Sequence, residues 1–252
     1  MKYLTLVRAN LSRHLVRTGL TVISVAMALS RCASLRTGVT TTAKTAQSGG
    51  ARRLVTTTAT GSVFPLPLAY ANRLAAVPGV EAVSWANWFG GRYGDGKRFF
   101  ANFAVDAESY LAMYPEIQLP ADQRAAWLQD KSSAIIGKRL LDVFGWRLGQ
   151  NVTLQGTIFP GDWTFTIRGV YTPSDAVLND DMLLFHHALL DERIGRAGIA
   201  GWYVLQIDDP NHAAAIAKAI DDQFRHSSEP TKSGTEQAFN ASFATMWGNV
   251  SL

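Results

Sequence analysis

The chain of 252 residues contains a single cysteine, Cys32. One cysteine cannot form an intramolecular disulfide, so a disulfide scaffold and a cysteine-rich metal site are both excluded. Core packing must therefore hold the fold together, and a hydrophobic content of 47% supplies an ample core. The same composition argues against an intrinsically disordered chain.

Acidic residues are absent before Glu81, although this stretch contains ten basic residues. From Glu81 onward the balance reverses, with 14 basic and 20 acidic residues. A protein that binds nucleic acid normally carries its basic residues on the surface of the folded domain. The positive charge at the N-terminus favours a membrane as the partner instead, and we expect no nucleic-acid partner.

A long uninterrupted apolar run is also missing. Residues 19–29 are predominantly apolar and follow a basic amphipathic stretch, but Arg31 ends the run before the roughly 20 residues that a spanning helix needs. Cationic flanks stay on the cytoplasmic side of a membrane. This order predicts a membrane-associated N-terminal helix, with the rest of the chain on the extracytoplasmic side.

A secretory signal peptide is the alternative interpretation of this segment, because its apolar core needs only about 7–15 residues. The basic region before residue 19 is long for a signal peptide, and Arg31 directly before Cys32 argues against a lipoprotein cleavage site. We expect residues 1–50 to form an imperfect membrane span and a linker, retained as an anchor, with cleavage as the alternative.

Residues 51–252 are expected to form one extracytoplasmic domain of the α+β class. Period-2 alternation and β-branched residues predict strands at 53–60, 80–88, 98–105, 134–136, 151–154, 163–171, 182–185 and 202–207. Helical spacing predicts helices at 67–76, 106–114, 121–130, 138–144, 210–224 and 235–247. Helices and strands do not alternate regularly, so we predict two mixed lobes. One is formed by 51–105 and 201–252, and the inserted lobe by 106–200.

The sequence shows no catalytic constellation. The glycine-rich residues 90–96 lack the Gly-Lys-Ser/Thr ending of a phosphate-binding loop, so we expect a hairpin loop there. No serine lies in a Gly-x-Ser-x-Gly motif. Asp208 and Asp209 precede Pro210, which favours a helix cap over catalytic carboxylates. We therefore expect no enzyme activity and no cofactor.

The best candidate for a metal site is a pair of adjacent histidines with nearby acidic residues: His186 and His187 with Asp180, Asp181, Asp191 and Glu192. Adjacent residues of a regular element point in different directions, and the spacing matches no zinc signature. We expect these histidines to lie in the core or at the surface, without a metal.

Aromatic residues are concentrated in the predicted hairpin between 85 and 103. Most of them should be core residues, because aromatic side chains dominate the cores of domains. Trp88, Phe89 and Tyr93 lie nearest the loop. We expect these three to form an apolar contact surface for a partner or a lipid-like substrate.

Three segments carry a recognisable pattern. Residues 74–84 (LAAVPGVEAVS) read as a helix, a Pro-Gly turn and a strand. Residues 134–154 (AIIGKRLLDVFGWRLGQNVTL) read as a strand, a helix and a turn from Gly145 to Gly149, where glycine permits positive φ. Residues 165–171 (FTIRGVY) end a strand in a Gly-aliphatic-aromatic step. Together they resemble the periplasmic core domain of ABC transporter permeases of the MacB/FtsX type.

The resemblance implies a permease component in the cell inner membrane, with its main domain extracytoplasmic. It implies an export or mechanotransmission system with a separate ABC ATPase subunit, a periplasmic adaptor or lipid-like substrate, and a homodimer or heterodimer of permeases. The chain departs from the pattern because Arg31 breaks the first span and Leu252 stands where a second would begin. We therefore expect a truncated or decayed copy. The alternative is an exported or anchored periplasmic binding module without transport activity.

Overall fold

The computed structural model describes residues 24, 27, 49–61, 64–174 and 179–248. The chain divides into two units, Met1–Ser48 and Gly49–Leu252. The predicted membrane-associated helix belongs to the first unit, of which Ser24 and Met27 are described as helical and exposed; the rest of that prediction lies outside the described residues. No described helix is both long enough and apolar enough to cross a membrane.

In the described residues of the second unit, ten strands form one mixed sheet. Their order is β12-β1-β11-β3-β4-β9-β6-β8-β5, and β7 pairs with β8. The strands are β1 (Arg53–Thr58), β3 (Val80–Trp88), β4 (Ala101–Val105), β5 (Ile117–Gln118), β6 (Ser133–Gly137), β7 (Asn151–Gly156), β8 (Gly161–Pro173), β9 (Met182–His186), β11 (Trp202–Ile207) and β12 (Thr231–Thr235). A separate pair joins β2 (Leu66–Pro67) to β10 (Ile199–Ala200).

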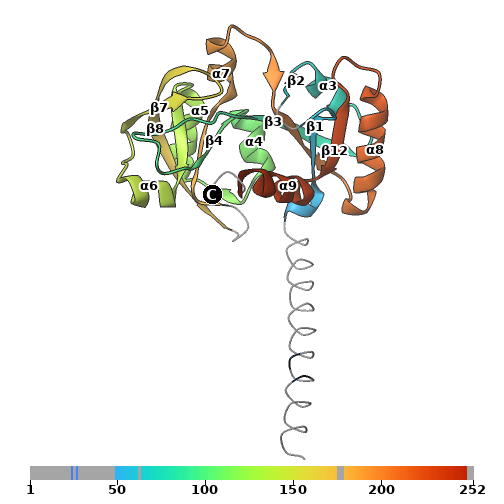
Figure 1. Ribbon diagram of the computed structural model, residues 1–252, viewed down its shortest axis with the longest axis horizontal. Helices are drawn as coiled ribbons and strands as arrows, with labels where there is room; N and C mark the ends of the chain where they lie inside the picture. The colour runs from blue at the N-terminus through green and yellow to red at the C-terminus, as the bar shows by residue number, and fades with distance from the viewer. Residues whose placement is uncertain (1–23, 25–26, 28–48, 62–63, 175–178, 249–252) are drawn as a thin grey trace, which may run out of the picture. The chain divides into compact units, whose positions relative to one another are not determined.

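Helices pack on both sides of this sheet. They are α3 (Tyr70–Ala75), α4 (Ala107–Met113), α5 (Ala121–Gln129), α6 (Lys138–Phe144), α7 (His187–Arg193), α8 (Ala213–Phe224) and α9 (Glu236–Gly248), with 3₁₀ turns η1 (Gly49–Arg52) and η2 (Pro210–His212). Figure 1 shows α6 and α8 at opposite ends of the domain, while α6, α9 and η1 lie along its lower edge. This mixture of helices and a mixed sheet agrees with the expected α+β class.

The sheet is continuous across β4 and β9, which pair in parallel from Ala101 with Met182 to Val105 with His186. The strands on the β4 side come from the segments expected to form lobe one, 51–105 and 201–252. Those on the β9 side come from the expected inserted lobe, 106–200. The two groups share one sheet, so the division into separate lobes stays a prediction.

The core follows from the alternation of side chains along each strand. Val55, Ala86 and Val204 point to one face, where they pack with residues of α4 and α5. Their sequence neighbours Leu54 and Leu205 point to the other face, beneath α3 and α8. A third cluster on that second face lies beneath α6 and α7. All three clusters are built from residues after 48, so we expect the unit from 49 to 252 to fold without the first 48 residues.

Candidate functional site

The expected contact surface lies at the loop between β3 and β4, and Asn102 fixes the shape of that loop. The side chain of Asn102 is fully buried. Its Oδ1 accepts from the backbone N–H of Gly91 (2.7 Å), and its Nδ2 donates to the carbonyls of Gly91 (2.9 Å) and Phe100 (3.0 Å). Arg92 and Gln155 exchange two backbone hydrogen bonds (2.9 and 2.8 Å), which attach the loop to β7. Hydrogen bonds from Asn102 and from β7 therefore fix the start of the loop at Gly91 and Arg92.

Trp88 lies at the end of β3 and is half-buried. Its ring contacts Phe103 (centroids 5.2 Å apart), Phe243 of α9 (5.5 Å) and Phe99 (5.9 Å). Phe99 is 68% exposed, so this aromatic cluster reaches the surface. Trp88 therefore joins β3 and α9 to an exposed side chain, and its role in partner contact stays a prediction.

Phe89 has a different position from the one we expected. Its side chain is fully buried, and its ring contacts Phe159, Trp163, Phe165 and Phe185. Phe89 directly follows β3, and its N–H donates to the carbonyl of Asn102 (3.0 Å), so the alternation of β3 continues and Phe89 points to the face opposite to that of Trp88. The expectation that Phe89 contributes to an exposed contact surface is wrong, because this side chain is part of the core.

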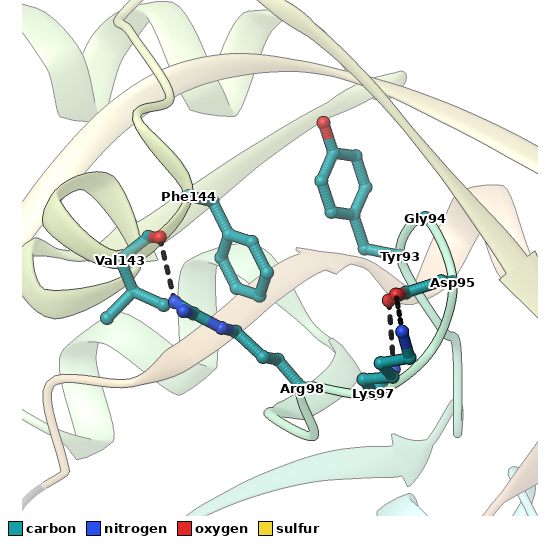
Figure 2. Close-up of a pocket in the computed structure, with 7 residues that line it drawn as sticks. All are labelled: Tyr93, Gly94, Asp95, Lys97, Arg98, Val143 and Phe144. Atoms are coloured by element: carbon teal, nitrogen blue, oxygen red, sulfur yellow. Dashed lines mark hydrogen bonds and ion pairs between the residues drawn. The ribbon is translucent and has the colours of Figure 1, made fainter.

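Tyr93 lines an open hollow of about 360 Å³ between the loop and α6. Figure 2 shows Tyr93 on one side of this hollow, with Val143 and Phe144 of α6 on the other. The Tyr93 ring packs edge-on against Phe144 (5.3 Å) and Trp146 (4.9 Å). The structure therefore places Trp88 and Tyr93 in different aromatic groups: Trp88 packs against the cluster beneath α4 and α5, and Tyr93 against the cluster that contains Phe89.

Two cations, Lys97 and Arg98, and one carboxylate, Asp95, line the hollow. Lys97 forms an ion pair with Asp95 (3.1 Å), and hydrogen bonds from Lys97 lower the pKa of that carboxyl. Arg98 donates one hydrogen bond to the carbonyl of Val143 (3.2 Å), as drawn in Figure 2. Among the described residues no carboxylate forms an ion pair with Arg98. Arg98 can therefore meet an anion from outside.

The two turn glycines flank the connection from α6 to β7. Gly145 ends α6 with φ of 66°, and Gly149 has φ of 83°. Both angles lie in the left-handed region, where a residue with a Cβ atom is strained. These glycines therefore turn the chain so that Trp146, between them, reaches the core.

The adjacent histidines are buried structural groups. His186 Nε2 donates to the carbonyl of Trp127 (2.8 Å), and His187 Nε2 donates to that of Ile199 (2.8 Å). Burial lowers the pKa of both imidazoles, so they are neutral near pH 7. Among the described residues, no group of three potential ligands is arranged to hold a metal ion.

Asp209 caps η2 by accepting from the N–H of Asn211 (2.8 Å).

A buried ionic network at the lower edge of the domain was not foreseen from the sequence. Arg53, the first residue of β1, donates from Nε to Glu236 Oε2 (2.6 Å) at the start of α9. Its Nη1 donates to Glu116 (3.0 Å) and to the carbonyl of Met113 (3.1 Å), the last residue of α4. Its guanidinium also lies 4.4 Å from the centre of the Tyr114 ring. Three segments far apart in the sequence therefore meet at one cation.

The protonation states of this network are set by burial and by charge. Burial alone would lower the pKa of Arg53, but the Glu236 carboxylate outweighs it and the pKa is raised. Burial raises the pKa of Tyr114 well above its usual value, with Tyr110 and Glu236 adding to the effect. The Tyr114 hydroxyl therefore stays protonated and donates to Glu236 Oε1 (2.5 Å).

No protein-family model matches this chain, and no curated protein matches it. Among solved structures, the chain is similar to the periplasmic region of MacB from Actinobacillus actinomycetemcomitans, with a TM-score of 0.51 and 11% sequence identity. This match covers 77% of the present chain and 93% of that one. The extracellular domain of YknZ, an ABC-type transporter from Gram-positive bacteria, has a TM-score of 0.49 at 13% identity and covers 72% of this chain and 99% of its own.

The likeness to the MacB region shows a shared fold, which confirms at that level the resemblance seen in three sequence segments. Residues 74–84 form the end of α3, its turn and the start of β3. Residues 134–154 form β6, α6 and most of β7, and residues 165–171 lie within β8. The segments that carry the resemblance thus lie on both sides of the β4–β9 pairing.

Proposed function

We propose that this chain is a permease component of an ABC export or mechanotransmission system. A separate ABC ATPase drives the motion, and the domain from residue 49 onward engages an extracytoplasmic substrate or partner. The observation that supports this proposal is the fold shared with the periplasmic region of MacB. The basic and apolar residues 1–48 attach the chain to the cytoplasmic membrane, with a second permease, identical or different, as the partner.

The buried network gives this proposal a physical route for motion. Arg53 is the first residue of β1 and directly follows η1, and Glu236 begins α9, so one short ion pair (2.6 Å) joins β1 to α9. Glu116 extends the connection to the segment after α4 (3.0 Å). A pull on the residues before η1 would therefore act on α9 and on that segment together, because separating buried charges is costly.

Membrane topology is the first test. Lys232 is exposed in β12, so the full chain with Cys32→Ser and Lys232→Cys presents its one thiol on the domain surface. We expect a membrane-impermeant maleimide to label this thiol in intact cells with a permeable outer envelope. The chain should also remain in membranes after alkaline extraction. Labelling that occurs only after cell lysis would place the domain in the cytoplasm and overturn the proposal.

Association with an ATPase is the second test. The full chain should co-purify from detergent-solubilised membranes with an ABC ATPase, and ATP turnover by that ATPase should change when the chain is present. The variant Arg53→Met serves as a comparison at temperatures where its domain is still folded, because it removes the proposed connection while leaving residues 1–48 unchanged. An ATPase that neither binds the full chain nor responds to it would contradict a permease role.

The second candidate function is an exported or anchored periplasmic binding module without transport activity. The short apolar run of residues 19–29 favours it, since that length suits a signal peptide. Mass spectrometry of the chain from cells separates the exported module from the anchored forms. Loss of about 30 residues supports the exported module, whereas an intact Met-Lys-Tyr start supports an anchored chain, and the ATPase test then separates the permease component from an anchored module.

A further inference from the structure

The loop of residues 92–99 and α6 form a basic face on a domain that is acidic elsewhere. Residues 92–98 and 138–147 contain six lysines and arginines, all exposed, and two carboxylates. Residues 49–252 hold 17 basic and 20 acidic residues in all. The rest of the domain therefore has a net negative charge, and these two segments have a net positive charge.

Exposed apolar side chains lie among these cations. Phe99 is 68% exposed, Leu148 53% and Val143 40%. Arg139 and Val143 are four residues apart on α6, so they share one side of the helix. Arg98 contacts the backbone of Val143 from the loop (3.2 Å), which joins the loop and the helix into one surface. We call this surface, defined by Arg98, Phe99, Arg139, Val143, Arg147 and Leu148, the basic face.

We propose that the basic face binds the surface of an anionic phospholipid bilayer. Arginine and lysine attract anionic head groups, while Phe, Leu and Val between them enter the boundary between head groups and acyl chains. A nucleic acid or an acidic protein would meet the same cations, but neither accounts for large apolar side chains left in water between them.

The position of the basic face in the domain supports this partner. Its helix α6 lies along the same lower edge as η1, which directly follows residues 1–48 (Figure 1). Those residues are the ones that we propose to attach the chain to a membrane, so this argument rests in part on the proposed function. The aromatic cluster of Trp88, Phe99 and Phe243 extends the face toward α9. Aromatic rings of this kind are enriched at membrane interfaces.

Vesicle binding by the domain from residue 49 to 252 tests the proposal without residues 1–48. We expect co-sedimentation with vesicles of phosphatidylcholine containing about one-third phosphatidylglycerol, and none with phosphatidylcholine alone. The variant Arg98→Gln/Arg139→Gln/Arg147→Gln should bind roughly 100-fold more weakly, because each cation near an anionic surface contributes about a fivefold gain. Absence of binding to the anionic vesicles would overturn the proposal.

Matched variants separate the basic face from general charge. Arg124, Lys131 and Lys232 are exposed cations outside the face, so Arg124→Gln/Lys131→Gln/Lys232→Gln removes the same charge elsewhere. We expect this control to bind as the parent domain does. Equal loss in both triple variants would show unspecific attraction and would also overturn the proposal. Circular dichroism must show that each variant melts as the parent does.

A fluorescent label reports whether the apolar part of the face enters the bilayer. The domain from 49 to 252 contains no cysteine, so Leu148→Cys and Lys232→Cys each provide one labelling site. A polarity-sensitive dye at residue 148 should shift to the blue when anionic vesicles are added, and the same dye at residue 232 should not. A shift at neither residue, or an equal shift at both, would contradict docking through the basic face.

These outcomes are distinct from those that test the proposed function. If the full chain is cytoplasmic but the domain binds anionic vesicles through the basic face, the inference stands and the proposed function fails. If the full chain is anchored and faces outward but the domain ignores anionic vesicles, the proposed function stands and this inference fails.

Discussion

The variant Arg53→Met is predicted to destabilise the domain strongly. Arg53 is 8% exposed and makes the charged contacts described above with Glu236 (2.6 Å) and Glu116 (3.0 Å). Methionine keeps much of the volume but leaves two carboxylates without their cation. Removing one partner of a buried ion pair costs about 3–5 kcal/mol. For a domain of this size, such a loss lowers Tm by roughly 6–20 °C, at about 2–4 °C per kcal/mol.

A matched variant isolates the effect of burial. Arg168 pairs with Asp130 at 3.1 Å, but the two side chains are 44% and 26% exposed. The same change there, Arg168→Met, should cost less than about 1 kcal/mol, because exposed ion pairs contribute little. Both variants can be measured in the domain from 49 to 252 by urea unfolding, with tryptophan fluorescence as the signal.

A double variant then tests whether the two charges act as a pair. Glu236→Gln added to Arg53→Met removes one of the two uncompensated carboxylates, so it should recover part of the loss, with a coupling energy of roughly 1–3 kcal/mol. The reasoning would be refuted if Arg53→Met cost no more than Arg168→Met. It would also be refuted if the two single losses simply added in the double variant.

Three further predictions concern other parts of the domain. Burial lowers the pKa of His187 below 6.5, so the unfolded chain takes up a proton first as the pH falls, and the folded domain loses stability below that pH. In His187→Gln the urea midpoint should fall less steeply with decreasing pH than in the parent domain. An unchanged pH dependence would contradict this. Phe89→Ala should lower the free energy of unfolding by about 3–5 kcal/mol, because it removes a buried side chain. Phe99→Ala should change it by less than about 0.5 kcal/mol in the same assay. Equal effects would count against the core position of Phe89. Gly149→Ala strains a φ of 83° in open space and should cost about 1–2 kcal/mol. Gly156→Ala would place a Cβ 1.9 Å from the Phe159 carbonyl oxygen, so its melting temperature should fall much further.

Local patterns predicted the elements whose residues alternate or repeat strongly. The bounds of β3 and β11 agree with the expected strands at 80–88 and 202–207, which are rich in β-branched and aromatic residues. The apolar stripe of α8 was also visible, and the structure buries it as Ile216, Ala217, Ile220 and Phe224. By contrast, β12 has the sequence TKSGT, which carries no apolar alternation, and it was missed.

Pairings between distant segments could not be predicted in the same way. The parallel register of β4 with β9 joins segments that no local pattern relates. Arg53 and Glu236 are separated by 183 positions, and each alone resembles an ordinary surface charge. The period of a strand, however, could have corrected one error. Phe89 directly follows the strand predicted at 80–88, and extending the alternation of that strand by one residue points Trp88 and Phe89 to opposite faces.

The position of β1 has a consequence for how the domain is made. β1 lies between β11 and β12, so Leu54 pairs with Leu205 on one side and Thr235 on the other. Both partners are synthesised long after β1 itself, whereas β6 and β8 can pair much sooner. Until then β1 has two open edges, and such edges invite pairing with other chains. We therefore expect chains that end before β12 to aggregate more readily than the complete domain.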